Sequence, residues 1–343
     1  MTATTPTESE TQPNILWVVT GAAGFLGNNL VRELLAQGQT VRAAIHEDET
    51  PPSLVGLDIE IVQMEVRDRA SVEAAFRPNP GMETWVIHCA GNVTIADSVS
   101  PMVREVNVDG VVNVLDACRS NNVARLVYVS SIHSLPPIEG VRQESDRPED
   151  YDPAMVDGAY SQTKAEATRL VLEDKDIWRV VVLPTGMIGP GDYADTNLTR
   201  MVRDAASGAL PVSVEGGYDF VDVRDVAKGI ILAAQKGVDG RTYILSGAYV
   251  PASRMVAAVA SAKGRPRPPA LPLALVRIFT PLARWVAKIR GTNPIVTASS
   301  LEVLGEPGQF SSQRAYDELG FRARPFQETL RETVEWLDVR DAE

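Results

Sequence analysis

The sequence contains 343 residues, with 33 lysines and arginines against 45 aspartates and glutamates, so its formal net charge is −12. Hydrophobic residues make up 44% and charged residues 23%, the balance of a globular protein, and the length predicts about two domains or one large α/β unit with an appended lobe. The acidic balance argues against a nucleic-acid partner, whose phosphates need clustered basic residues, and the two cysteines, Cys89 and Cys118, are too few for a disulfide framework or a structural zinc site.

Two stretches bear on targeting and on membranes. Residues 1–13 are polar and rich in threonine, without a basic start or an apolar run, so they predict a disordered tail rather than a signal peptide, and we expect a cytoplasmic protein. Residues 270–289 are the most membrane-like stretch, but basic residues and prolines interrupt them, so no membrane span is expected. An amphipathic helix packed on the protein's own core is favoured there, with a membrane surface or a lipophilic substrate as the alternative contact.

Short apolar runs that are typical of strands alternate with longer amphipathic stretches through the first half of the chain. We expect strands at 14–20, 40–45, 59–63, 84–89, 125–130 and 178–183. Helices are expected from the end of a glycine-rich turn to about residue 37, and at 69–76, 102–121 and 159–174. Strands that alternate with helices in this way form βαβ units and a parallel sheet that is buried on both faces.

Beyond Pro184 the pattern loosens. Helices are expected at 197–207, 223–235 and 252–262, and one short strand at 241–245. The sequence therefore predicts an α/β fold, in which a doubly wound parallel sheet of the Rossmann type carries a smaller, mostly helical C-terminal lobe.

A glycine-rich turn follows the first strand, with the sequence TGAAGFLG at 20–27. Without side chains, the backbone N–H groups of such a turn can approach a pyrophosphate at the N-terminus of a helix, where unpaired amides and the helix dipole favour an anion. Three glycines can also simply form a tight turn, but their place between the first strand and the first helix favours a dinucleotide site. The residues expected to hold the cofactor are Gly21, Ala23, Gly24, Phe25, Leu26 and Gly27.

The end of the second strand bears on the choice of dinucleotide. It reaches His46 with no acid at its tip, and Glu47 and Asp48 come just beyond. An acid at the tip would hold the ribose 2′-hydroxyl of NAD, so its absence leaves space for the 2′-phosphate of NADP, to which His46 or Arg42 can supply positive charge. A solvent-facing Arg42 and an uninvolved His46 are the alternatives. The sequence therefore favours NADP as the cofactor, with NAD as the alternative.

Tyr160 and Lys164 lie four residues apart, on one face of a predicted helix. A lysine beside a tyrosine favours the phenolate and lowers the phenol pKa, and a phenol tuned in this way can exchange a proton with a ketone or an alcohol during hydride transfer. An ordinary surface pair is the alternative. Ser131 favours the catalytic interpretation, because it follows the fifth strand at the sheet edge where ligands bind in such folds and can bind the substrate oxygen. For Ser130 and His133, capping of the loop is as good an interpretation.

Seven segments in one order resemble the extended short-chain dehydrogenase/reductase family, and the resemblance covers nearly the whole chain after the tail. The nearest branch holds dihydroflavonol reductases, cinnamoyl-CoA reductases and 3β-hydroxysteroid dehydrogenases. The matching segments are TGAAGFLG (20–27), VIHCAG (86–91), VNVDGVVNVLDAC (106–118), LVYVSSI (126–132), YSQTK (160–164), LPTGMIGPGD (183–192) and FVDVRDVA (220–227).

The resemblance implies a role for each matching residue. Tyr160 is expected to be the acid/base, Lys164 to tune it and bind the nicotinamide ribose, and Ser131 to bind the substrate oxygen. Asn107 lies in the central helix whose asparagine orders the site in this family. Further cofactor contacts are implied for Cys89, Ala90 and Gly91 on the adenosine and pyrophosphate side, and for Pro184 and Ile188 beside the nicotinamide.

Two departures from the family pattern fall at the adenosine end of the expected site. Glu65, followed by Val66, stands where the family usually has an aspartate for the adenine amine, and the longer side chain can still serve. His46 replaces the arginine that is usual in members that use NADP.

Other residues of the matching segments receive structural interpretations. His88 and Cys118 lie within apolar segments and are expected to pack in the core. Asp222 and Arg224 can form a purely structural junction between a strand and a capped helix, and we assign them no catalytic role.

The motifs also divide the chain. A dinucleotide-binding domain of the Rossmann type is expected over 14–184, with a returning segment at about 218–246. The substrate-binding lobe would be assembled from 185–217 and 247–343.

Three functions are considered. The leading hypothesis is an NAD(P)-dependent reductase or dehydrogenase that transfers hydride between nicotinamide and a ketone, an aldehyde or a secondary alcohol of a moderately apolar small molecule. The second is a nucleotide-sugar epimerase or dehydratase with tightly held NAD, and the third is a cofactor-sensing regulator without catalysis. From the resemblance we also expect a homodimer, formed through the helices at about 102–121 and 159–174.

Overall fold

The computed structural model describes residues 14–46, 52–93, 99–138, 140–210, 212–272, 274–275 and 308–342. The predicted tail, Glu47 and Asp48, and most of the amphipathic helix predicted at 270–289 lie outside the described residues. Within the described part of the chain, no helix is both long enough and apolar enough to cross a membrane.

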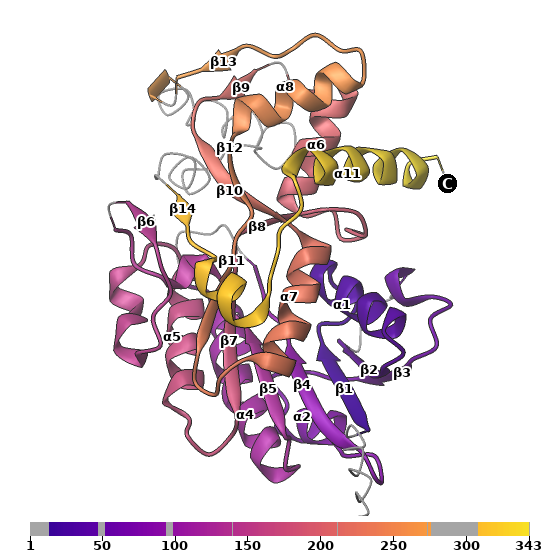
Figure 1. Ribbon diagram of the computed structural model, residues 1–343, viewed down its shortest axis with the longest axis vertical. Coiled ribbons are helices and arrows are strands. Elements are labelled where there is room, and N and C mark those ends of the chain that lie inside the picture. The colour runs from indigo at the N-terminus through magenta and orange to yellow at the C-terminus, as the bar shows by residue number, and fades with distance from the viewer. Residues whose placement is uncertain are drawn as a thin grey trace, which may run out of the picture.

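A seven-stranded sheet, counted over the described residues, forms the larger part of the molecule, in the order β11-β7-β5-β4-β1-β2-β3 (Figure 1). All neighbouring strands in it are parallel, so their carboxyl ends meet at one edge. The order reverses on either side of β1, which confirms the doubly wound fold predicted from the sequence. The strands are β1 (Ile15–Thr20), β2 (Thr40–Ile45), β3 (Glu60–Gln63), β4 (Glu83–His88), β5 (Arg125–Val129), β7 (Arg179–Pro184) and β11 (Thr242–Leu245).

Helices cover both faces of this sheet (Figure 1). Successive side chains of a strand point to opposite faces, so Trp17 and Val19 of β1 join one apolar core while Leu16 and Val18 join the other. On the first face lie α1 (Phe25–Ala36) and α7 (Val223–Lys236), and on the second α2 (Arg69–Ala75), α4 (Gly110–Ser120) and α5 (Ala159–Glu173).

The helix predicted at 102–121 is divided into three pieces. It begins with α3 (Pro101–Arg104), continues through a π-helical turn at Glu105–Asp109 and ends as α4. A π-helical turn holds more residues than an α-helical turn, and such turns often occur at functional sites. The turn here contains Asn107, which is buried.

The C-terminal lobe is mostly helical and also contains a three-stranded sheet in the order β12-β10-β8, counted within the described ranges. Its strands are β8 (Gly186–Ile188), β10 (Gly217–Asp222) and β12 (Ala248–Pro251), and its helices are α6 (Asn197–Ser207), α8 (Ala252–Ala262) and α11 (Phe326–Arg340). We did not predict β8 or β12, which are short and mix polar with apolar residues, and only the end of β10 was implied, by the junction between a strand and a helix at Asp222 and Arg224. After β10, the chain returns to the large sheet as α7 and β11.

Shorter elements complete the described chain. Short strands form two parallel pairs: β9 (Ser213–Val214) pairs with β13 (Ala270–Leu271), and β6 (Val141–Arg142) pairs with β14 (Gln309–Phe310). Single turns of 3-10 helix occur at Pro52–Leu54, Ile132–Ser134, Pro148–Asp150 and Pro153–Met155, and a second π-helical turn occurs at Ala315–Leu319.

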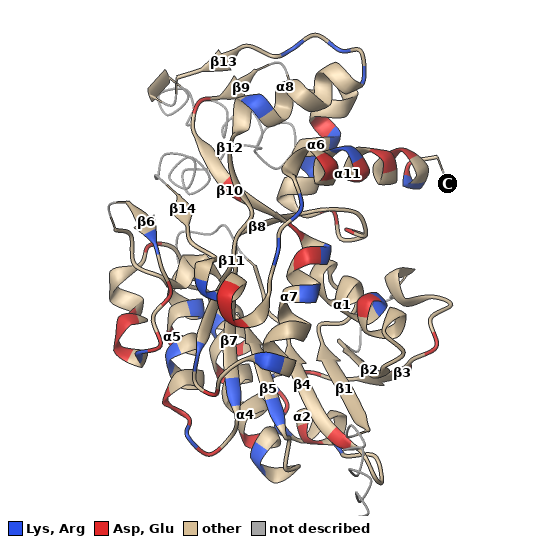
Figure 2. Ribbon diagram, viewed as in Figure 1, with Lys and Arg blue, Asp and Glu red and all other residues tan. Residues whose placement is uncertain are grey.

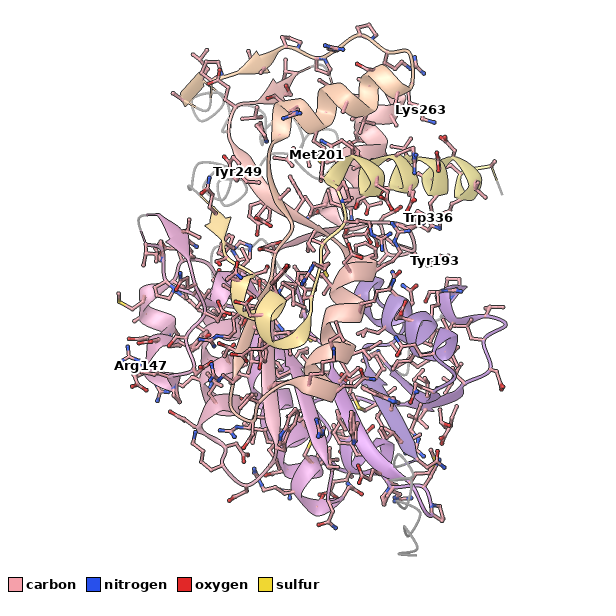
Figure 3. All side chains as sticks on the ribbon, viewed as in Figure 1. Arg147, Tyr193, Met201, Tyr249, Lys263 and Trp336 are labelled. Carbon is pink, nitrogen blue, oxygen red and sulfur yellow. The ribbon has the colours of Figure 1, made fainter. Side chains whose placement is uncertain are left out.

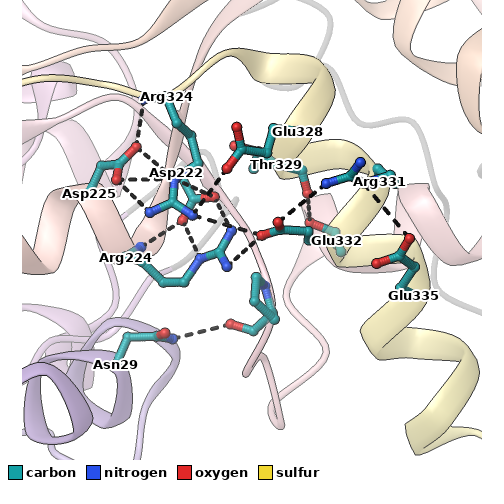
Figure 4. A network of polar contacts seen from close by, with 12 residues as sticks. Asn29, Asp222, Arg224, Asp225, Arg324, Glu328, Thr329, Arg331, Glu332 and Glu335 are labelled. Atoms are coloured by element: carbon teal, nitrogen blue, oxygen red, sulfur yellow. Dashed lines mark hydrogen bonds and ion pairs between the residues drawn. The ribbon is translucent and has the colours of Figure 1, made fainter. Parts of the chain in front are cut away.

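A network of ion pairs joins the start of α7 to α11 (Figure 4). The Asp222 carboxylate accepts a hydrogen bond from the Arg224 backbone N–H at 2.8 Å and pairs with the Arg224 guanidinium at 2.6 Å. Arg324 pairs with Asp225 at 2.7 Å, and Arg224 reaches Glu332 at 2.6 Å. This capped junction agrees with the structural interpretation of Asp222 and Arg224.

Opposite charges and aromatic rings also lie along α11. Acidic and basic residues are interspersed on this helix, so its exposed face carries no large field of one sign (Figure 2). Trp336 of α11 meets Tyr193, in the loop after β8, edge to face with 5.6 Å between ring centroids (Figure 3). This contact joins two segments of the C-terminal lobe that are far apart in sequence.

Candidate active site

The glycine turn between β1 and α1 brings three backbone segments into close contact. Gly21 has φ +63°, and a Cβ on it would lie 2.9 Å from Cα and N of Ala90. A Cβ on Gly27 would lie 2.1 Å from the carbonyl oxygen of Gly21, so the first turn of α1 packs directly on the loop. Gly24 precedes α1, whose first turn contains no acidic residue. Such a turn fits the pyrophosphate of a dinucleotide.

The other predicted residues of this turn complete the N-terminal end of α1. Phe25 and Leu26 are buried in its first turn, whereas Ala23 is half-buried in the loop before it. The Asn28 and Asn29 side chains donate hydrogen bonds to the carbonyl oxygens of Gly191 at 2.9 Å and Pro190 at 3.3 Å. The loop after β8 is therefore held against the helix that follows the glycine turn.

The loop after β4 lies beside the glycine turn and is fixed by Thr20. The Thr20 hydroxyl oxygen accepts hydrogen bonds from the backbone N–H groups of Cys89 and Ala90, both at 3.1 Å. Burial raises the pKa of the Cys89 thiol to about 12, so this side chain is a neutral lining group at physiological pH. A Cβ on Gly91 would lie 3.4 Å from Oδ1 of Asn107 and 3.6 Å from Nζ of Lys164. The structure thus brings Gly91 next to two predicted catalytic residues.

Near the ends of β2 and β3, the Glu65 carboxylate pairs with two basic side chains. It pairs with Arg67 at 2.7 Å and with Nε2 of His46 at 2.9 Å. The hydrogen bond from Arg67 lowers the pKa of Glu65 to about 2, so Glu65 is ionised at neutral pH. Val66 is buried, and a Cβ on Gly110 of α4 would lie 2.7 Å from it. Arg67 is a residue of this end that the sequence analysis missed.

Arg42 does not reach the carboxyl edge of the sheet. Its guanidinium is buried, pairs with Glu60 at 2.8 Å, and donates to the carbonyl oxygens of Ala75 at 3.1 Å and Arg77 at 2.6 Å. These partners tie β2 to β3 and α2. The prediction that Arg42 can bind a 2′-phosphate is therefore wrong, and the solvent-facing alternative is wrong as well.

Ser131 and Tyr160 meet at the carboxyl edge of the large sheet. Ser131 follows β5, and Tyr160 lies in the first turn of α5. Burial raises the pKa of Tyr160 to about 12, although a hydrogen bond with Ser131 lowers it in part. The sequence analysis expected a lowered pKa from Lys164, but removal of the phenol from water has the larger effect. At neutral pH Tyr160 is therefore a protonated phenol, able to donate a proton.

Lys164 lies one helical turn after Tyr160 and is also buried. Its Nζ donates a hydrogen bond to the carbonyl oxygen of Val129 at 2.8 Å and lies 5.0 Å from the ring centroid of Tyr128. Burial lowers the pKa of Lys164 to about 8. The ammonium is thus held at the end of β5, two residues before Ser131 along the chain.

Asn107 connects the loop after β4 to α5. Its Oδ1 accepts a hydrogen bond from the Asn92 backbone N–H at 2.7 Å, and its Nδ2 donates to the Asn92 carbonyl oxygen at 3.0 Å and to Oγ1 of Thr163 at 3.1 Å. Thr163 directly precedes Lys164. Asn107 therefore ties the loop after β4 to the turn of α5 that precedes Lys164.

Pro184 and Ile188 lie at the other side of this edge. Pro184 is the last residue of β7 and is paired in register with Leu245 of β11, whereas Ile188 ends β8 and is fully buried. Pro184 therefore lies at the carboxyl edge of the large sheet, whereas Ile188 belongs to the three-stranded sheet of the C-terminal lobe.

The structure brings two further aromatic residues to Tyr160. The His133 ring meets the Tyr160 ring edge to face, with 6.2 Å between centroids, and Nε2 of His133 lies 2.7 Å from the hydroxyl oxygen of Tyr218. Sequence reasoning treated capping of the loop and a functional role as equally good interpretations of His133, and it did not consider Tyr218. The place of His133 two residues after Ser131 was a usable signal, whereas Tyr218 lies on a strand that was not predicted.

Other polar residues of the motifs have structural partners. The Ser130 hydroxyl lies 2.6 Å from that of Thr168 and 3.2 Å from that of Ser134, away from the reacting groups. His88 is buried with Nδ1 2.8 Å from Oγ1 of Thr20, and Cys118 is buried in the second core, as expected. Among the described residues, no group of three or more His, Cys, Asp or Glu side chains could hold a metal ion.

With this geometry in place, comparison with known proteins identifies the family. The sequence pattern of the NAD-dependent epimerase/dehydratase family matches residues 17–246. The chain belongs to that family. This confirms the resemblance read from the seven segments and makes the protein an enzyme of the extended short-chain dehydrogenase/reductase type.

Individual members of the epimerase/dehydratase family align with almost the whole chain. Sterol demethylase protein B of Methylococcus capsulatus is 30% identical over 332 residues, covering 94% of this chain and 98% of the relative. A putative dihydroflavonol 4-reductase of Synechocystis is 28% identical over 331 residues, covering 93% of each. The crystal structure of gox2253 superposes with a TM-score of 0.79 at 26% identity and covers 95% of this chain and 98% of that chain.

Proposed function

We propose that this member of the family is an NAD(P)-dependent oxidoreductase that moves hydride between nicotinamide and a ketone, an aldehyde or a secondary alcohol, with Tyr160 as the acid/base. The half-buried Tyr160, which hydrogen-bonds Ser131 and lies one helical turn before the buried Lys164, is the observation that carries this proposal. In the reductive direction the carbonyl carbon gains a hydride, and the carbonyl oxygen gains the phenol proton. Ser131 binds that oxygen, and solvent then returns a proton to Tyr160.

The residues at the sheet edge fit a dinucleotide. A bound nicotinamide supplies or takes up the hydride. The glycine turn would hold the pyrophosphate, because its glycines let the backbone pack closely at the N-terminus of α1, where unpaired N–H groups favour an anion. Lys164 would bind the nicotinamide ribose. The further proposed contacts are Ala23, Phe25, Leu26, Glu65, Val66, Cys89, Ala90, Gly91, Pro184 and Ile188.

We further propose NADP(H) as the preferred cofactor, with NAD as the alternative. In support, β2 ends at Ile45 and is followed by His46 rather than by an acid, and His46 and Arg67 both pair with the Glu65 carboxylate at this end of the sheet. A dianionic phosphate would gain from the Arg67 guanidinium and from a hydrogen bond with the His46 ring. Steady-state KM values for NADPH and NADH test this, and a strong preference for NADH would remove the proposal.

A moderately apolar substrate is favoured by the charges of the C-terminal lobe. A nucleotide sugar carries a diphosphate, which arginines usually bind. In the lobe, Arg203 and Arg340 pair with Asp195, and Arg324 pairs with Asp225. The sterol and dihydroflavonol in the names of two relatives are ring compounds of low charge, which agrees with this proposal.

The alternative function is a nucleotide-sugar epimerase or dehydratase, which the name of the family favours. Such an enzyme would use the same Tyr160 and would retain its NAD between turnovers. The cofactor-sensing regulator is less well supported, because the pair Tyr160 and Lys164 is kept and relatives are named as reductases.

We also propose the division into a cofactor-binding part and a substrate-binding part that the motifs predict, together with a homodimer. Residues 14–184 and the returning segment at about 218–246 would bind the dinucleotide, and residues 185–217 and 247–343 would bind the substrate. The dimer would form through the helices at about 102–121 and 159–174.

A substrate panel separates the two catalytic functions. The protein would be incubated with NADPH or NADH and with aromatic ketones, aldehydes, 3-ketosteroids and nucleotide sugars, while nicotinamide absorbance is followed. We expect net oxidation of the cofactor with an apolar ketone or aldehyde. A cofactor that copurifies without exchange, together with sugar epimerisation and no net redox change, would establish the alternative instead.

A further inference from the structure

Tyr218 and His133 form a polar bridge between the two parts of the molecule. Tyr218 belongs to β10 of the C-terminal lobe, whereas His133 follows β5 of the large sheet. Their side chains meet through Nε2 and the hydroxyl oxygen at 2.7 Å, and their rings lie nearly parallel, at 17°, with 6.0 Å between centroids. The link therefore joins elements 85 residues apart in sequence, beside the predicted catalytic edge.

The Tyr218 ring is held in place by its surroundings. A Cβ on Gly186 of β8 would lie 2.6 Å from Cε1 and 2.7 Å from Cδ1 of Tyr218, so the ring occupies the space that a side chain there would need. The Phe220 ring packs against it edge to face, with 5.7 Å between centroids. Because apolar contacts fix the ring, its hydroxyl group presents a defined partner to His133.

From His133, contacts continue to the reacting groups. The His133 backbone N–H donates a hydrogen bond to Oγ of Ser131 at 3.3 Å, and the His133 ring meets the Tyr160 ring at 6.2 Å. The bond to Oγ restricts the directions in which the Ser131 hydroxyl can donate. Ser131 in turn hydrogen-bonds Tyr160.

We propose that Tyr218 and His133 are positioning residues for the reaction, coupling the C-terminal lobe to the alignment of Ser131 and Tyr160. Tyr218 acts through His133, which sets the direction of the Ser131 hydroxyl group and one wall of the space beside the Tyr160 ring. The inference rests on the proposed role of Tyr160. It assigns to β10 a function beyond forming the lobe, since the strand that contributes Tyr218 would align the groups that bind the substrate oxygen.

The test compares Tyr218→Phe, His133→Phe and the double variant, with NADPH or NADH and the panel ketone that is turned over fastest. Both single variants keep the aromatic rings and lose the polar bridge. We expect kcat to fall roughly five- to tenfold in each, as the loss of one neutral hydrogen bond implies, while KM for the cofactor stays unchanged. The double variant should lose no more than either single variant, because both remove the same link.

Two further variants separate positioning from a general effect on folding. His133→Gln keeps a side-chain amide that can reach the Tyr218 hydroxyl, so its kcat should recover to within about twofold of the native value. Tyr249→Phe alters an exposed tyrosine of the neighbouring strand β12 (Figure 3) and should leave kcat unchanged. Thermal melting should give similar midpoints for all variants.

The inference fails if both single variants keep native kcat, or if their effects multiply in the double variant. It also fails if the loss appears only as a lower melting temperature or a higher cofactor KM. In each of these cases a Tyr160→Phe variant without activity would still support the proposed function. If the native enzyme turns over no panel ketone at all, both the proposed function and this inference are overturned.

Discussion

Burial favours the neutral forms of Tyr160 and Lys164. It raises the pKa of the Tyr160 phenol to about 12 and lowers the pKa of the Lys164 ammonium to about 8. A protonated phenol is the form that donates to a carbonyl, so ketone reduction needs no prior ionisation of Tyr160. The nearby His88 follows the same rule, because burial lowers its pKa to about 3 and it stays neutral at physiological pH. At this scale the site combines a neutral phenol and a neutral imidazole with the Lys164 ammonium, each held in a fixed position.

His88 makes the stability of the fold depend on pH. Its pKa falls from 6.5 to about 3 on folding, chiefly through burial and also through Lys164, so the unfolded chain binds more protons than the folded chain between these values. The stability from His88 is complete above pH 6.5 and is lost as the pH falls through this window. By about pH 5 the loss is about 2 kcal/mol.

Urea unfolding at pH 7 and at about pH 5 measures this effect. Between these conditions the native chain should lose about 2 kcal/mol more than His88→Phe, whose ring keeps the stacking on Tyr128 without titrating. His88→Gln serves as a second non-titrating variant if the first folds poorly. An identical pH dependence in native and variant chains would show that His88 does not cause the loss.

Among the elements, the turn from β1 into α1 leaves the least space for an added side chain. At Gly27 a side chain would meet backbone rather than a flexible neighbour, so Gly27→Ala must displace α1 from the turn. We expect NADPH to bind more than about tenfold more weakly, and the free energy of unfolding to fall by about 1–3 kcal/mol. Isothermal titration calorimetry gives the cofactor affinity directly.

Gly38→Ala is the matched control for this turn. Gly38 follows the C-cap of α1 and has φ +70°, and no heavy atom lies within 4 Å of a Cβ added there. The substitution therefore strains the backbone without causing a collision. Its unfolding free energy should fall by roughly 1–2 kcal/mol while NADPH affinity stays native. Native affinity in Gly27→Ala would contradict the role given to this turn.

The elements also show what the sequence can predict. An apolar run followed by glycines at fixed spacing locates β1, the turn and α1 within one or two residues, because the local pattern and the buried parallel sheet favour the same structure. The strands β8 and β12 were missed and β10 was implied only at its end, since these strands are short and are stabilised by pairing between segments distant in sequence.

Side-chain partners set a second limit on prediction from sequence. Ser131 and Tyr160 were found because strand ends and helix spacing place them, whereas the link from His133 to Tyr218 depends on an unpredicted strand. Arg42 was misplaced for a related reason. Its position on β2 was correct, but its length lets it reach the main chain beyond α2, which no local pattern indicates.

Over the whole molecule, few charges are needed to hold an anionic cofactor. Backbone amides of the glycine turn and the basic groups near Glu65 would meet the phosphates, so a net charge of −12 is compatible with that role. The C-terminal lobe is held to the sheet by the ion pairs of Arg224 and Arg324 and by contacts of Asn28 and Asn29. Cofactor and substrate parts would therefore form one interwoven unit.

Dimerisation belongs to this scale and is predicted for the face of α3, α4 and α5. Met102 is 50% and Val112 41% exposed there, as expected of apolar side chains that a partner covers. Light scattering of the native protein should give the mass of a dimer. Val112→Glu should give a monomer, because it places a charge in the apolar contact, whereas Val339→Glu on α11 should remain dimeric. A native protein that is monomeric at working concentration would remove the prediction.

The central claim, that Tyr160 exchanges the proton that accompanies hydride transfer, is tested most directly by Tyr160→Phe in single-turnover assays with NADPH or NADH and the best panel ketone. The rate of hydride transfer should fall by about 10²–10⁴, while cofactor affinity and melting temperature stay native. Tyr316→Phe, at an exposed tyrosine of the C-terminal π-helical turn, should react at the native rate. Full turnover by Tyr160→Phe would contradict the account.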